Sequence, residues 1–266
     1  MLAVAYNMKT KLYTIYLIAG LGSTVFNPDA VRAQNTVSNL DSALVQDCNH
    51  PMGLTKNTEF VYQVTDRGKN DGTLSNKVMQ QAMTPEGEFV TTVKSARINN
   101  KKRPETAEEF TIRCKGDTVY LDAILLLREQ AQKTFSGKEL EYTPTDLAYP
   151  HQMEVGQKLP DGKLLVRVRN SVSDITHLQM SAINRKVEGK QQITTPAGTF
   201  DSYRISYQYI IKLNTMGVNI EDVYQVEEYY STENGIVKLQ FTNKKGKKGK
   251  GIELITKKNP VQAFQR

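Results

Sequence analysis

The clearest pattern in the chain is the alternation of apolar and polar residues at the end of the stretch from Arg185 to Ile211. Residues 203–211, YRISYQYII, repeat with a period of two, which gives a strand one buried and one solvated face. Before them, Thr195-Pro196-Ala197-Gly198 supplies proline where a type I turn needs a φ of about −65° and glycine where φ becomes positive. The stretch predicts one long β-hairpin.

Weaker versions of the same alternation predict about eleven strands in all. Turns between them are indicated by Thr84-Pro85-Glu86-Gly87 and by Asn234-Gly235. A bulge is predicted where Ala182 and Ile183 break the alternation. The number of strands suits an all-β fold, mainly antiparallel, built as a curved sheet, a sandwich or an incomplete barrel. Besides the two arms of the hairpin, the first of which is continuous with a strand over 177–187, the predicted strands cover residues 60–64, 75–83, 88–98, 107–114, 118–121, 164–169, 223–230, 236–241 and 252–256.

Two stretches depart from the strand pattern. Residues 122–132 have apolar positions near 3.6 spacing behind a capping Asp122, which predicts one short helix that packs on the sheet or covers it. Residues 135–150 contain Pro144 and Pro150, so we expect a long crossing connection there rather than a strand. The chain then forms a single β-rich domain over 51–259, whose two meanders join near 135–155, followed by a tail over 260–266.

The N-terminus has the pattern of a secretory signal peptide. Lys9 and Lys11 precede a mostly apolar run over 12–26, and small residues flank Arg32 in Val31-Arg32-Ala33. This predicts a signal peptide over 1–33 with cleavage near Ala33, then a polar tether over 34–50. The run is shorter than the roughly 20 residues that span a bilayer, and no second one follows. We therefore expect an exported protein without a transmembrane anchor, located in the periplasm or associated with the outer envelope.

The two cysteines, Cys48 and Cys114, would both reach an oxidising compartment on export. A disulfide is the natural inference, and two buried free thiols are the alternative. Cys48 lies well inside the mature chain, so lipid attachment directly after the leader is not expected.

Charge is concentrated near the C-terminus. The formal net charge is +7, of which the leader contributes +2 through Lys9, Lys11, Arg32 and Asp29. Five lysines match the remaining +5: Lys244, Lys245, Lys247, Lys248 and Lys250. They form either a solvated turn or a contact for anionic lipid headgroups or acidic polysaccharide. The remainder is balanced, which argues against a nucleic-acid partner.

Motifs of known chemistry are absent from the sequence. His50, His151 and His177 lie far apart without metal-ligand spacing, so we expect no metal, and no nucleotide or hydrolase motif indicates a cofactor or a catalytic residue. Glu227 and Glu228 are neighbours in a predicted strand, so they point to opposite faces and do not form a glycosidase pair. A hydrolase that uses one inward glutamate remains an alternative.

Tyrosines gather on the C-terminal strands, where they either fill the core or form the wall of a ligand cleft. The candidates for contact with a ligand or partner are Tyr207, Tyr209, Tyr224, Tyr229 and Tyr230.

Several short motifs, taken in order, resemble the TapB-like family of uncharacterised exported proteins from Gram-negative envelopes. They are YQVTDRG (62–68), CKGDTVYLD (114–122), Tyr149-Pro150 ahead of VGQ (155–157), the hairpin over 187–200, and GIVK (235–238). The resemblance covers nearly the whole mature chain and implies an all-β exported domain with an envelope role, but no settled activity. The chain departs from the family pattern, which has glutamate at Gln191, cysteine at Ser202 and tryptophan near Tyr229; these departures weaken the case for a catalytic glutamate or a second bridge.

These observations favour a non-enzymatic exported envelope protein whose β-sheet groove binds a lipid-like or apolar ligand or a segment of a partner. Two other hypotheses are an envelope scaffold without a ligand cavity and the hydrolase described above. The expected partners are lipid, an envelope protein or an anionic polysaccharide.

Overall fold

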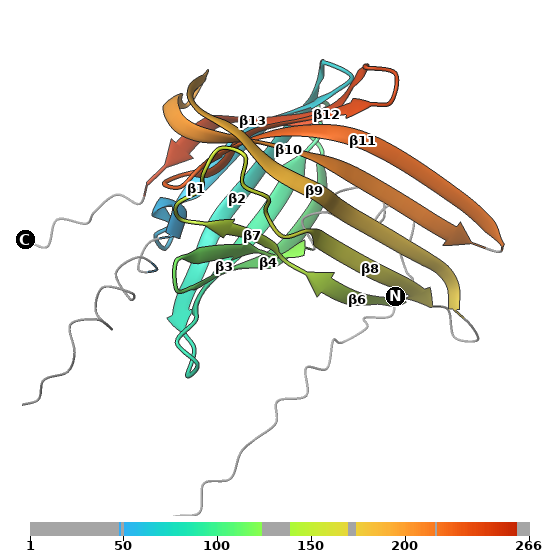
Figure 1. Cartoon of the computed structure of the whole chain (residues 1–266), viewed down its shortest axis with the longest axis horizontal. Coiled ribbons are helices and arrows are strands. Elements are labelled where there is room, and N and C mark those ends of the chain that lie inside the picture. The colour runs from blue at the N-terminus through green and yellow to red at the C-terminus, as the bar shows by residue number, and fades with distance from the viewer. Residues whose placement is uncertain (1–47, 49–50, 124–138, 170–173, 216, 260–266) are drawn as a thin grey trace, which may run out of the picture. The chain divides into compact units, whose positions relative to one another are not determined.

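The computed structural model describes residues 48, 51–123, 139–169, 174–215 and 217–259. They form one antiparallel sheet of thirteen strands in the order β6-β8-β9-β10-β11-β12-β13-β1-β2-β3-β4-β5-β7 (Figure 1). The all-β class is therefore confirmed. A short 3-10 turn, η1 (Pro51–Gly53), precedes the strands, which are β1 (Glu59–Asp66), β2 (Lys69–Met83), β3 (Phe89–Ile98), β4 (Pro104–Lys115), β5 (Thr118–Leu121), β6 (Glu139–Thr145), β7 (Leu147–Pro150), β8 (Gly162–Arg169), β9 (Asp174–Thr195), β10 (Gly198–Thr215), β11 (Val218–Ser231), β12 (Gly235–Asn243) and β13 (Lys248–Lys258).

The sheet is nearly closed and barrel-like because its two edge strands follow each other in the sequence. Among the described strands, β6 pairs only with β8 and β7 only with β5, and Asp146 alone separates β6 from β7. At this crossing, Arg113 Nη2 donates to Asp146 Oδ2 over 2.6 Å and the Ala123 N–H donates to Oδ1 over 3.2 Å. The closing point is thus held by an ion pair to β4 and a hydrogen bond to the segment after β5.

Our prediction of a connection over residues 135–150 was wrong for 139–150, which form β6 and β7. These two strands account for the difference between the predicted eleven and the observed thirteen. Pro144 and Pro150 are compatible with them because an edge strand has one side without ladder hydrogen bonds, where a missing N–H is tolerated. The predicted helix lies outside the described residues except for its first two positions, 122 and 123. The leader, most of the tether and the tail also lie outside them.

The central hairpin is confirmed and is longer than predicted. β9 and β10 pair from Thr176 opposite Thr215 to Thr195 opposite Gly198, which leaves Pro196 and Ala197 as the loop. The bulge lies slightly later than predicted, because Tyr207 faces both Asn184 and Arg185 where Ala182 and Ile183 were expected. Asn184 adopts φ +57°, and the extra residue turns the Arg185 side chain inward, where it is 1% exposed.

The inner face of the sheet is packed with apolar side chains. β8 shows the pattern most clearly, because Leu164, Val166 and Val168 are buried while the residues between them are not. The inner face also contains a cavity of about 60 Å³, lined by residues such as Phe60 and Val78. Among the described residues, no helix is long and apolar enough to cross a membrane.

Candidate functional site: a polar cleft beside the disulfide

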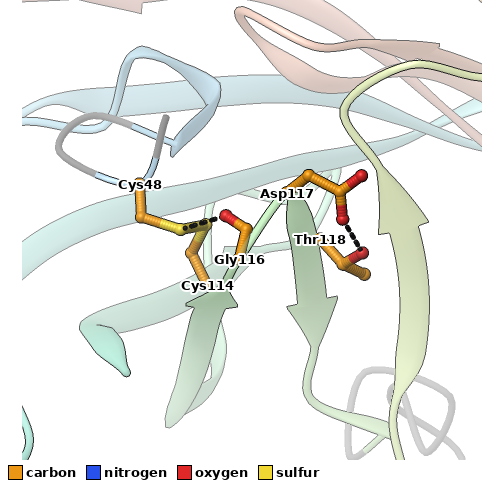
Figure 2. The surroundings of a disulfide bond; sticks show 5 residues. All are labelled: Cys48, Cys114, Gly116, Asp117 and Thr118. Atoms are coloured by element: carbon orange, nitrogen blue, oxygen red, sulfur yellow. Dashed lines mark hydrogen bonds between the residues drawn. A yellow bond between two sulfur atoms is a disulfide. The ribbon is translucent and has the colours of Figure 1, made fainter. Parts of the chain in front are cut away.

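A disulfide fixes one end of the sheet. Cys48 is bonded to Cys114 near the end of β4, with their Cα atoms 5.6 Å apart, as predicted (Figure 2). Cys48 Sγ also lies 3.1 Å from the carbonyl oxygen of Gly116 in the β4–β5 turn. This is a close contact rather than a hydrogen bond, because a bridged sulfur has no proton. The bridge holds the segment before η1 against the β4–β5 turn.

A cleft of about 360 Å³ opens beside this bridge. Its volume falls within the range typical of small-molecule sites, roughly 300–1,000 Å³. Segments distant in sequence form it: η1, the β4–β5 turn, the residue after β7, the β11–β12 turn and the end of β13. The lining combines an apolar part with polar groups of both charges: Met52, Gly53, Cys114, Val119 and Tyr230, together with Asp117, His151, Thr232, Glu233, Asn234 and Lys257.

Lys257 is the half-buried cation of the cleft. Its Nζ donates to Asn234 Oδ1 over 2.8 Å, lies 3.5 Å from the Glu233 carbonyl oxygen, and sits 5.3 Å from the centre of the Phe60 ring. Burial lowers the pKa of Lys257, because desolvation disfavours the ammonium, and the nearby Glu233 carboxylate partly opposes this. The ammonium is therefore held in place by neutral oxygens and remains beside the cleft.

Gly53 allows the cleft wall to form. It adopts φ +61°, and a Cβ at this position would lie 2.7 Å from the Glu233 carbonyl oxygen and 3.0 Å from Lys257 Nζ. Only glycine satisfies both the backbone conformation and this close approach without strain.

Behind the cleft, Tyr230 connects to a buried polar cluster. Its ring stacks on Tyr149 of β7 with the centroids 4.3 Å apart, and the Arg185 guanidinium lies 4.5 Å from the centre of the Tyr149 ring. Arg185 Nη1 donates to the carbonyl oxygens of Ala148 and Pro160, over 3.1 and 2.9 Å. This Arg185–Tyr149–Tyr230 stack joins the edge strand β7 to β9 and β11, across the inside of the sheet.

Glu228 is the carboxylate of this buried cluster and is 0% exposed. Its Oε2 accepts a hydrogen bond from the Tyr207 hydroxyl over 3.1 Å, whereas Oε1 has no hydrogen-bond partner within the part of the chain that the structure describes. Burial raises the pKa of Glu228, and the charge of Arg185 opposes the shift without cancelling it. Burial likewise raises the pKa of Tyr207 and Tyr149, and the Glu228 charge adds to both shifts.

Glu227 and Glu228 lie on opposite faces, as predicted. Glu227 is on the outer face, where it pairs with Arg204 over 3.3 Å. Among the described residues, the groups that shift the pKa of Glu228 are Arg185 and tyrosines, not a second carboxylate or a histidine. The surroundings of Glu228 therefore give the hydrolase alternative no second acid or histidine among the groups that shift its pKa.

The predicted tyrosines divide into three environments. Tyr207, Tyr209 and Tyr230 are buried, and of the five only Tyr230 lines the cleft. Tyr224 is half-buried and packs near Tyr209 and Phe241. Tyr229 lies on the outer face opposite Arg204. Whether any of them contacts a ligand stays a prediction.

The remaining candidates are spread over the structure. Of the histidines, His151 lines the cleft, His177 is exposed on β9, and His50 lies outside the described residues. No three His, Cys, Asp or Glu side chains of the described part come together as metal ligands. The five predicted lysines lie in and after the β12–β13 turn, at the opposite end of β13 from Lys257.

Comparison with known proteins identifies the family. The DUF3108-like family model matches residues 55–254. The chain belongs to the DUF3108-like family. The solved structures that resemble this member of the family include a candidate lipoprotein of Parabacteroides distasonis, with a TM-score of 0.64 and 18% identity over 77% of this chain and 96% of that one. A candidate exported protein of Bacteroides fragilis with a YmcC-like fold gives a TM-score of 0.61 and 16% identity, over 77% and 97%. At such identities the likeness concerns the fold alone. No curated protein matches the chain.

Proposed function

We propose that this DUF3108-like protein is an exported cell-envelope protein of the TapB-like kind, which acts by binding a segment of a partner in the cleft beside the disulfide. The cleft carries the proposal, since it is a lined space of about 360 Å³ and the cavity of the inner face has only about 60 Å³. The proposal therefore takes the partner-segment form of the sequence-based hypothesis rather than the form with a lipid-like ligand.

The lining of the cleft fits a short peptide segment. Met52, Val119 and Tyr230 offer apolar contacts for a side chain, while Lys257 and Asp117 add opposite charges to the lining. A peptide has apolar side chains together with polar groups that accept from an ammonium or donate to a carboxylate. A space of about 360 Å³ suits a few side chains rather than a folded domain.

The exported location is supported by the leader pattern and the disulfide. A bond between Cys48 and Cys114 forms and persists in an oxidising compartment. The two structural neighbours are described as a candidate lipoprotein and a candidate exported protein, in agreement with this location. We expect cleavage near Ala33 to release the mature protein into the periplasm.

Site-specific photo-crosslinking in the envelope tests the proposal. A photoreactive residue at Thr232, inside the cleft, should give a defined adduct, and the same residue at the exposed Thr194 should not. In the Thr232 protein, Lys257→Met should weaken that adduct, because methionine retains an apolar chain and removes the ammonium. Equal labelling from both positions, or no adduct from Thr232, would contradict the proposal.

A further inference from the structure

Three turns rich in lysine and arginine lie next to one another at the end of the sheet opposite the cleft. They join β1 to β2 at Arg67-Gly68, β3 to β4 over 99–103, and β12 to β13 over 244–247. The Arg67 N–H donates to the Gly249 carbonyl oxygen over 2.9 Å, and Arg97 Nη2 donates to the Asp71 carbonyl oxygen over 2.9 Å. Figure 1 shows the β1–β2 and β12–β13 turns side by side at the top of the view. From β12 to β4 the sheet extends roughly 24 Å at the usual strand spacing.

These turns and their flanking residues carry far more charge than the five lysines predicted from the sequence. Residues 66–72, 97–105 and 243–251, which we call the basic end, contain eleven cationic and three acidic side chains, a net of +8. The full chain has +7, so everything else sums to −1. Two of the three acidic side chains form ion pairs with the buried Arg97. Its Nη2 lies 2.6 Å from Asp71 Oδ2, and its Nε lies 3.0 Å from Glu105 Oε2. The net positive charge of the chain is therefore concentrated in the basic end.

Two of the turns share one backbone design, which orients their side chains outward. Asn99 Oδ1 accepts from the N–H groups of Lys101 and Arg103, over 2.9 and 3.0 Å. Asn243 Oδ1 accepts from those of Lys245 and Lys247 over the same two distances. Because an asparagine holds each turn, the cationic side chains are not used in these bonds, and the exposed ones extend into solvent.

Cations also occupy backbone positions that favour glycine or asparagine. Lys102 is the fourth residue of the turn that begins at Asn99, and it adopts φ +60°. The equivalent residue of the turn that begins at Asn243 is Gly246, which adopts φ +71°. Arg67 adopts φ +51° in the β1–β2 turn. The β3–β4 and β1–β2 turns thus each hold a cation at a position where glycine would be less strained.

We propose that the basic end docks on a bilayer surface that exposes anionic phosphate headgroups. The turns line neither of the two cavities described above, and residues 101–103 and 244–248 are exposed, so this surface suits an extended partner rather than an enclosed ligand. Most of the cations are lysines, whose point charges suit a mobile layer of phosphates, whereas arginine is favoured for fixed bidentate recognition. Ile98, which is 44% exposed beside the β3–β4 turn, adds an apolar contact. Docked this way, the protein keeps its cleft free for a partner.

Vesicle sedimentation with the purified protein tests the docking. Binding is expected to vesicles of phosphatidylcholine with phosphatidylglycerol, to be weak without phosphatidylglycerol, and to fall as salt rises. Three variants that each lose three positive charges separate position from net charge. Two remove cations from different turns of the basic end, and the third removes exposed lysines elsewhere: K101S/K102S/R103S, K244S/K245S/K247S and K56S/K94S/K158S.

Each variant of the basic end should lower the partition coefficient by roughly 100-fold, since a lysine near an anionic surface contributes about fivefold. The third variant should change it by less than about threefold, because those charges are screened from the surface. Similar losses in all three variants would show a net-charge effect and overturn the proposal. Binding that ignores phosphatidylglycerol but responds to an acidic polysaccharide would overturn it in favour of a polysaccharide partner.

Lys102→Gly provides a second test that does not depend on destabilisation. Glycine removes one charge and relieves the positive φ, so the thermal midpoint should stay the same or rise while vesicle binding weakens about fivefold. Unchanged binding with a raised midpoint would mean that this lysine contributes nothing to docking and would contradict the proposed role of the strained positions.

Discussion

The buried carboxylate Glu228 gives the sharpest prediction about stability. Glu228→Gln keeps the shape of the side chain and an oxygen that accepts from the Tyr207 hydroxyl, but it cannot become charged. The titratable and charged groups that act on Glu228 come from three strands: Arg185 on β9, Tyr149 on β7 and Tyr207 on β10. Comparing the stability of Glu228→Gln with that of the wild type therefore tests whether the ionised carboxylate stabilises or destabilises the fold.

The direction in which the free energy of unfolding changes with pH follows from the raised pKa of Glu228, for which burial is the first cause. Between the carboxyl pKa of the unfolded chain, about 4.3, and the higher pKa of the folded protein, the folded state holds a proton that the unfolded state has lost. The free energy of unfolding must then decrease as pH rises through this window, by up to about 1.4 kcal/mol per pH unit. Above the pKa of the folded protein, the free energy of unfolding does not decrease further from this group. Wild type and Glu228→Gln should be equally stable at the acidic end, and the variant should be the more stable near neutral pH.

Urea unfolding of both proteins across this pH range measures the effect. The difference between the two free energies is the useful quantity, because titrations common to both proteins cancel in it. If the attraction between Glu228 and Arg185 outweighed burial instead, the variant would leave an uncompensated buried guanidinium and lose about 3–5 kcal/mol at neutral pH. That loss, or a difference that does not change with pH, would refute the reasoning.

Two further predictions concern the cleft. Replacing both Cys48 and Cys114 by alanine should lower the free energy of unfolding by about 4 kcal/mol from loop-closure entropy; reducing agent should affect the wild type and leave the variant unchanged, and an equal response of both proteins would contradict a stabilising bridge. Gly53→Ala should be more destabilising than Gly87→Ala in thermal unfolding, because both have positive φ but only Gly53 has a backbone oxygen, that of Glu233, in the way. Equal losses would show that strain alone matters.

The alternation of residues predicted most of the sheet, because each predicted strand has one face in the core. It failed for β6 and β7, where the prolines outweighed the pattern. Pro144 and Pro150 are excluded from a central strand but not from an edge, and nothing local in the sequence tells which strands are edges. That distinction depends on pairings such as β1 with β13, which are set by the whole chain.

The candidate site was predictable only in parts. The disulfide followed from the cysteine count and the leader, and the inward direction of Glu228 was one of two options that the alternation allowed. Arg185 was not predicted as an inner residue, although the broken alternation beside it was a signal for the bulge that turns it inward. The cleft itself brings together turns from both ends of the sequence, so neither local pattern nor composition could show it.

The basic end shows the same limit of a linear reading. The run of lysines near the C-terminus was conspicuous, whereas Lys101, Lys102 and Arg103 formed an ordinary charged loop some 140 residues earlier. Pairing of β13 with β1, and of β2 with β3, brings these loops to one end. The net charge of sequence segments cannot show that loops distant in sequence lie at the same end of the sheet.

The pairing of β1 with β13 also sets the order in which this protein can assemble. Glu59 lies opposite Lys258, so the earliest described strand waits for the latest one before its second ladder can form. β1 can pair with β2 early, but it lacks its second partner strand until β13 is available. Contacts of such long sequence separation slow folding and lengthen exposure to aggregation. A holding chaperone should therefore matter more to this protein than to one whose neighbouring strands are also neighbours in sequence.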